Sequence, residues 1–89
     1  EIKDALGEYN KVWEILSRKI QDNMSLGLES MKNGDMDQAV NYFNEVLKIN
    51  PERKEAYFSL ADSYEKKGLY SVGMVLRLQG ERIKQGGHD

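Results

Sequence analysis

Few residues in this chain of 89 could do covalent chemistry. The single histidine, His88, lies one residue from the end and follows Gly86-Gly87, where a chain tends to fray. Such a histidine is far more often a tail residue than a general base. The absence of cysteine excludes cysteine nucleophiles, thiolate metal sites and disulfides. No glycine-rich phosphate loop follows a strand pattern. We therefore expect no enzyme activity, no metal site and no cofactor.

Composition points to one small soluble domain. Charged residues make up 31%, hydrophobic residues 39%, and the formal net charge is −2, which gives no reason to expect a nucleic-acid surface. No apolar run approaches the length of a membrane span and no signal-peptide pattern is present, so we expect no membrane insertion. We favour the cytoplasm, although the missing initiator methionine also fits a processed or exported chain.

The chain contains an internal sequence repeat with a period of 34 residues. Residues 25–49 share five identities with residues 34 positions later, and four with residues 34 positions earlier. The pairs are Ser25–Ser59, Leu26–Leu60, Lys32–Lys66, Gly34–Gly68 and Ile49–Ile83, then Ala5–Ala39, Asn10–Asn44, Val12–Val46 and Ile15–Ile49. A fixed period of this length is typical of repeat arrays, in which each unit buries its apolar face against its neighbours.

The residues at fixed places in this period resemble the tetratricopeptide repeat (TPR), a helix–turn–helix unit of 34 residues. Residues 20–53 form the best copy, with Leu26-Gly27, the turn Asn33-Gly34-Asp35-Met36, Ala39, Phe43 and Asn50-Pro51. Residues 54–85 form a second copy, with Tyr57, Leu60-Ala61, Tyr64 and Gly68, but with Gly73, Arg77 and Gly80 in place of alanine, aromatic and alanine. Residues 1–19 resemble only the second helix of an earlier copy, and residues 86–89 are expected to be a flexible tail.

The resemblance implies an all-α fold of antiparallel helical hairpins, stacked as a short right-handed solenoid of about five helices. Local signals agree. Gly34 and Gly68 suit the left-handed residue that ends a helix, and Asp35 suits the start of the next. Asn50-Pro51 predicts a helix end followed by a first-turn proline. Whether the chain turns or stays helical between Lys19 and Asn23 is open, because neither proline nor a glycine break occurs there.

The resemblance also implies where a partner binds. The first helix of each TPR hairpin lines a concave groove, and the family's contact positions correspond to Gln21, Met24, Leu28, Met31 and Lys32, then Glu55, Phe58, Asp62, Glu65 and Lys66. Met24, Leu28 and Met31 share one helical face by spacing alone. An amphipathic partner with apolar anchors and some lysine or arginine would suit this mixture of apolar and acidic residues. The carboxylate clamp of chaperone-binding members is not expected, because Met24, Leu28, Phe58 and Asp62 hold its places.

A heptad seam in the N-terminal segment supports a second interpretation. Apolar residues follow alternating steps of four and three, at Ile2, Leu6, Tyr9, Trp13, Leu16 and Ile20. This seam could pack on the first repeat, on upstream repeats or on a second copy of the chain, with Leu6, Tyr9, Trp13 and Leu16 as self-association contacts. The Met24–Leu28–Met31 stripe could likewise be packing. Two functions stay open: a scaffold or adaptor that binds a peptide or helix of a partner protein, or a structural element that dimerises or packs through its N-terminal helix.

The last helix is expected to cap the array. Arg77, Gly80 and Glu81 hold the places that would face a following repeat, where the first copy has Phe43, Val46 and Leu47. A polar outer face is what a terminal repeat needs for solubility. The sequence therefore predicts a C-terminal capping helix within residues 54–85.

Overall fold

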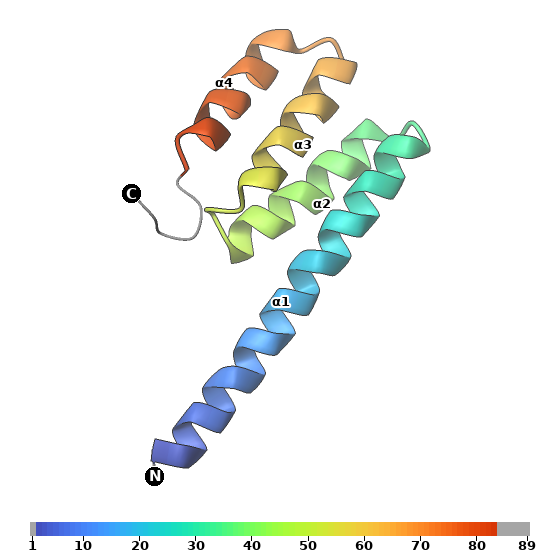
Figure 1. Cartoon of the computed structure of the whole chain (residues 1–89). Helices are drawn as coiled ribbons and strands as arrows, with labels where there is room; N and C mark the ends of the chain where they lie inside the picture. Colours follow the sequence, from blue (N-terminus) through green and yellow to red (C-terminus); the bar gives the residue numbers. More distant parts are fainter. Residues whose placement is uncertain (1, 84–89) are drawn as a thin grey trace.

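The computed structural model describes residues 2–83, with side chains from residue 10 onward. Within that range it has no strand and four helices: α1 (Ile2–Lys32), α2 (Met36–Ile49), α3 (Lys54–Lys66) and α4 (Tyr70–Glu81). The helices form two antiparallel hairpins, α1–α2 and α3–α4, and α2 packs against α3 (Figure 1). The expected stack of helical hairpins is confirmed. There are four helices instead of about five because residues 2–32 form one continuous helix.

The two hairpin turns have the predicted chemistry. Gly34 and Gly68 adopt φ values of +86° and +87°, in the left-handed region that glycine enters without a steric penalty. The Asp35 carboxylate accepts a hydrogen bond of 3.1 Å from the backbone N–H of Gln38, which makes Asp35 the N-cap of α2. The turns therefore recur with the 34-residue period of the sequence.

The link between the hairpins differs in detail from the prediction. Asn50 ends α2, and its side-chain oxygen accepts a hydrogen bond of 3.1 Å from the backbone N–H of Glu52. This local turn carries the chain past Pro51 before α3 begins at Lys54. Pro51 is therefore a turn residue, and the prediction that it lies in the first turn of the next helix was wrong. The Tyr57 hydroxyl donates to the Pro51 carbonyl at 3.1 Å and holds α3 against this turn.

The core lies where α1, α2 and α3 meet. Its buried apolar residues are Ile20, Met24, Ala39, Val40, Phe43, Val46, Ala56 and Leu60. Phe43 is fully buried, and its ring lies directly against Gly27 of α1. A Cβ atom at position 27 would lie 2.4 Å from Cε1 of Phe43, so only glycine leaves room for the ring.

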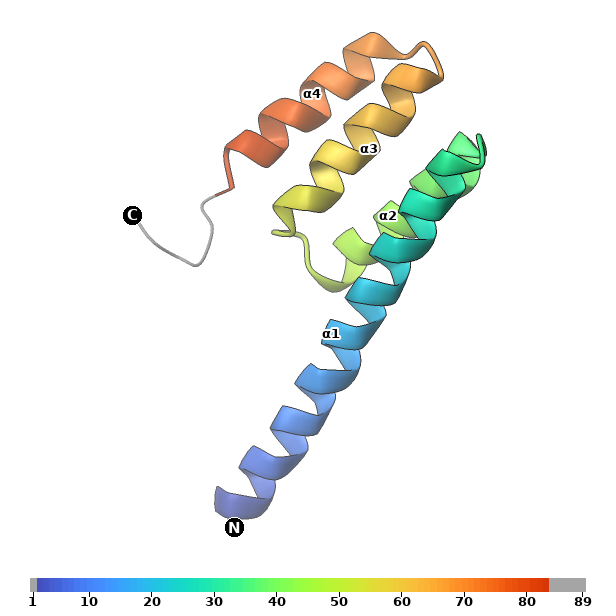
Figure 2. The same ribbon diagram turned by 45° about the vertical axis from the view of Figure 1, so that its right-hand side comes forward.

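The first half of α1 extends past the end of α2 with no other described helix beside it (Figures 1 and 2). Ser17 stands 34 positions before Pro51, and without a proline the backbone hydrogen bonds of α1 continue through this point. Trp13 is 58% exposed. The N-terminal segment therefore does not fold back onto the first repeat, which was one of the arrangements expected for it.

The outer surface of α4 is apolar, so the expected polar outer face was wrong. Its exposed large residues are Tyr70, Val72, Met74, Val75 and Leu78. Gly73 and Gly80 are buried instead, and both approach side chains of α3. Because glycine supplies the contact with α3, the larger apolar side chains of α4 are left on its solvent side.

Candidate protein-binding surface

The predicted contact positions occupy equivalent environments on α1 and α3. Pairs of positions 34 residues apart share the same class of exposure in four cases out of five: Gln21 and Glu55, Leu28 and Asp62, and Lys32 and Lys66 are exposed, and Met31 and Glu65 are half-buried. The fifth pair is Met24, which is buried, and Phe58, which is half-buried. The first helices of the two hairpins thus present the same face.

The Met/Leu stripe of α1 divides between core and surface. Met24 is only 8% exposed and belongs to the core, and Met31 is half-buried and packs against that core. Leu28 is 52% exposed. Of the three residues, Leu28 offers apolar area to a partner, while Met24 supports the surface from beneath.

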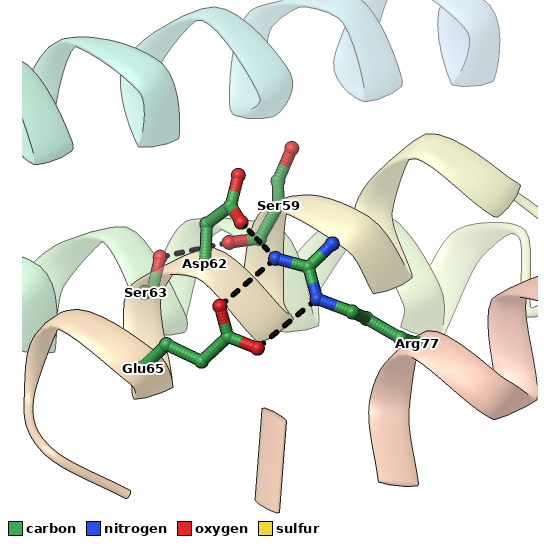
Figure 3. Close-up of polar contacts among 5 residues, drawn as sticks. All are labelled: Ser59, Asp62, Ser63, Glu65 and Arg77. Atoms are coloured by element: carbon green, nitrogen blue, oxygen red, sulfur yellow. Dashed lines mark hydrogen bonds and ion pairs between the residues drawn. The ribbon is translucent and has the colours of Figure 1, made fainter. Parts of the chain in front are cut away.

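Arg77 of α4 joins two of the three carboxylates of this surface on α3, those of Asp62 and Glu65 (Figure 3). Its Nε and Nη2 atoms donate to the two oxygens of Glu65 at 3.0 and 2.9 Å, which is the bidentate geometry that suits a guanidinium. Nη2 also donates to Asp62. Two carboxylates and one guanidinium leave one net negative charge in the cluster.

Hydrogen bonding favours the ionised forms of Glu65 and Arg77. The hydrogen bond from Arg77 lowers the pKa of Glu65 below its ordinary value, and partial desolvation opposes that shift. The bonds to Glu65 and then Asp62 raise the pKa of Arg77. Glu65 and Arg77 are therefore charged at neutral pH, and their hydrogen bonds position the Glu65 carboxylate before any partner arrives.

Gly73 allows the cluster to form. A Cβ atom at this position would lie 2.6 Å from Cγ of Glu65 and 3.1 Å from the carbonyl oxygen of Ala61, so α4 approaches α3 closely here. Sequence reasoning placed Arg77 on the outer face and missed this role. A signal was present: Asp62 and Glu65 are three residues apart on one helix, and Arg77 follows Gly73 by four on the next, so each pair shares a face.

A hollow of about 460 Å³ lies beside the cluster, lined by Asp62, Glu65, Lys66 and Tyr70.

At the other end of α3, Phe58 is less available to a partner. The Lys54 ammonium lies 5.9 Å from the centre of the Phe58 ring, and a Cβ atom at Gly80 would lie 3.0 Å from that ring. Glu55 pairs with Arg53, with Nε and Oε1 3.3 Å apart. The part of the surface nearest the α3–α4 turn is thus the more open one.

A larger hollow, of about 620 Å³, lies between α1 and α2 and contains none of the predicted contact residues. Its lining includes Asn23, Asn41, Tyr42 and Asn44. The amide of Asn23 is already used, because it donates to the Lys19 carbonyl at 2.9 Å. This hollow gives no support to the predicted groove.

Residues 2–83 lack two further classes of site. Nowhere in that range do three or more histidine, cysteine, aspartate or glutamate residues come together in a way that could hold a metal ion. No helix of the same range is both long and apolar enough to cross a membrane. His88 and the predicted tail at 86–89 lie outside the described residues, as do the side chains of Leu6 and Tyr9.

Comparison with known proteins agrees with the fold. Residues 27–68 match the family model described as TPR repeat, over the last six residues of α1, all of α2 and α3, and the turn after α3. No curated protein and no solved structure gave a significant match. The chain is thus similar to the TPR repeat family in its 34-residue period, in its stacked hairpins and in this match.

Proposed function

We propose that this chain is a non-catalytic protein-binding module, which holds a peptide or an amphipathic helix of a partner on the surface formed by α1 and α3. TPR repeats generally serve protein–protein interaction. The observation that carries the proposal is that Leu28 and Asp62 occupy equivalent positions. These residues hold the same position in consecutive repeats, and both are exposed.

The two positions offer complementary chemistry. Leu28 supplies an exposed apolar contact on α1, with half-buried Met31 one turn further along. Asp62 and Glu65 supply carboxylates that Arg77 holds in place, with one net negative charge remaining. An amphipathic helix carries apolar residues on one face and charges on its flanks. A partner helix with leucine-like anchors and a lysine or arginine on its flank fits this surface.

Chemical-shift mapping tests the proposal. The ¹⁵N-labelled chain is titrated with two designed helical peptides that share one leucine face and carry either lysines or glutamates on the flank. We expect the lysine peptide to bind more tightly and to shift the amide signals of Leu28, Met31, Asp62 and Glu65. Leu28→Asp should abolish these shifts, whereas Gln38→Lys, at an exposed position of α2, should leave them unchanged. Shifts confined to residues 10–19 or to the outer face of α4 would refute the proposal.

A second function is self-assembly through the N-terminal helix. The observation that favours it is the exposure of Trp13 on the part of α1 that extends past α2. A large aromatic residue on an apolar seam usually finds a packing partner. Since no described helix supplies one, we propose that a second copy of the chain does.

A further inference from the structure

The apolar stripe of α1 runs on past the end of α2. Ile20 is 5% exposed and packs in the core. Leu16 and Trp13 precede it by four and seven residues, so they continue the same face of one helix. Leu16 is half-buried and Trp13 is exposed. From Ile20 onward, α2 covers the stripe. Two turns earlier, at Trp13, the stripe is uncovered, and α1 runs straight between these points (Figures 1 and 2).

Charged residues occupy the side of α1 opposite this stripe. Lys11, Glu14 and Arg18 recur at steps of three and four, and all three are exposed. The charges on the free half of α1 therefore lie away from the stripe, and exposed Val12 and Ile15 add apolar area outside it. An isolated helix of this length is only marginally stable in water, which means that a packing partner would stabilise it.

The first repeat is not built to be that partner. Ala56 and Leu60, by which α3 joins the core with α2, correspond to Asp22 and Leu26 of α1. Asp22 is exposed, as is Glu29 one turn beyond Leu26. A helix that folded back over this face would have to bury these carboxylates, which is costly. The free half of α1 must find its partner elsewhere.

We infer that this half of α1 pairs with the same segment of a second copy, and that the two helices run antiparallel. The inference rests on the proposed self-assembly and specifies its geometry. A parallel partner laid on the stripe would run directly into α2, which covers the same face from Ile20 onward. An antiparallel partner runs the other way, away from α2, and places the hairpins of the two copies at opposite ends.

The sequence of the seam suits this arrangement. Its steps of four and three residues are the same in both directions, so an antiparallel register aligns seam positions 6, 9, 13 and 16 with those of the second copy, while Ile20 stays covered by α2. Trp13 then lies opposite position 9 of the second copy, and Leu16 opposite position 6. The two-fold axis passes near Lys11. The flanking pairs bring Asn10 to Asn10 and Val12 to Val12, with no like charges opposed.

Disulfide trapping tests the direction of pairing, because the chain contains no cysteine of its own. In the antiparallel register Val12→Cys meets its own counterpart beside the axis. The two cysteines of Leu16→Cys are then about 15 Å apart along the helix, too far for a disulfide. In a parallel pair the opposite holds, because Leu16 would meet Leu16 in the seam. We expect Val12→Cys to form covalent dimers in a glutathione redox buffer and Leu16→Cys to remain monomeric.

Sedimentation velocity of the full chain over a concentration series tests whether the pair exists. We expect a monomer–dimer equilibrium that Trp13→Glu abolishes and that Glu14→Lys, on the charged face, preserves. Amide signals of α2 and α3 report whether the hairpins stay folded in each variant. A monomer at every concentration would refute both self-assembly and the inferred geometry, as would a dimer that Trp13→Glu leaves intact. A Trp13-dependent dimer that is trapped by Leu16→Cys and not by Val12→Cys would retain self-assembly and overturn the antiparallel arrangement.

Discussion

Substitution of Gly27 by alanine separates helix propensity from tertiary packing. Propensity alone predicts that Gly27→Ala stabilises α1 by about 1 kcal/mol. The structure predicts the opposite, because the new Cβ would lie 2.4, 2.7 and 2.8 Å from three atoms of the Phe43 ring. Ordinary carbon–carbon contacts are about 3.5–4.0 Å, so the ring or the helix must move by roughly 1 Å.

The fully buried ring has little room to move. Overpacking a core costs about 1–3 kcal/mol, and a clash with three atoms of one ring belongs in the upper half of that range. After the helix-propensity gain, we expect Gly27→Ala to lower the free energy of unfolding by about 1–2 kcal/mol. For a domain of this size, that loss corresponds to a fall in Tm of roughly 4–16 °C.

Urea denaturation followed by circular dichroism measures this change. Ser25→Ala, at an exposed position of α1 close to Gly27, controls for helix propensity. This substitution should change the free energy of unfolding by no more than about 0.5 kcal/mol. In a Phe43→Leu background, where the ring is gone, Gly27→Ala should become neutral or stabilising, which a double-mutant cycle reports as coupling. Stabilisation of the wild-type background by Gly27→Ala would refute the close approach of α1 and α2.

Three further predictions concern the turns and the charged cluster. Asp35→Ala should cost about 1 kcal/mol in urea denaturation by removing the N-cap of α2, with Asp35→Asn restoring most of the loss; equal stability of all three chains would contradict the cap. Glu65→Gln should be less stable than wild type at pH 7. Because the folded-state pKa of Glu65 is lowered, this difference is fully present above the ordinary value of 4.5 and vanishes as the pH falls through the folded-state value; a difference that persists in strong acid would contradict the ionic contact. Gly73→Ala should displace Glu65 from Arg77, and NMR titration should show the pKa of Glu65 returning toward 4.5; an unchanged pKa would show that α4 tolerates the methyl group.

Features set by local sequence were predictable. The turns at Gly34 and Gly68 need a left-handed residue, and the start of α2 needs a side-chain acceptor at Asp35, so each signal lies within a few residues of its effect.

Features set by contacts across helices were not predictable in the same way. The absence of a proline at Ser17 permits α1 to continue but does not require it, because packing between helices decides whether the chain turns back there. The position of Arg77 depends on how closely α4 approaches α3 at Gly73, a distance that no spacing rule supplies. The apolar outer face of α4 follows from that same approach, because glycine takes the inner face.

The most direct test of the binding surface is a reversal of its charge. Asp62→Lys changes the net charge of the cluster around Arg77 from one negative to one positive, while Glu65 still holds Arg77 through two hydrogen bonds. Isothermal titration calorimetry then measures the affinities of the lysine-flanked and glutamate-flanked helical peptides for both chains. Wild type should prefer the lysine peptide, and Asp62→Lys should prefer the glutamate peptide. An order of affinities that is the same for both chains would contradict a partner site on α1 and α3.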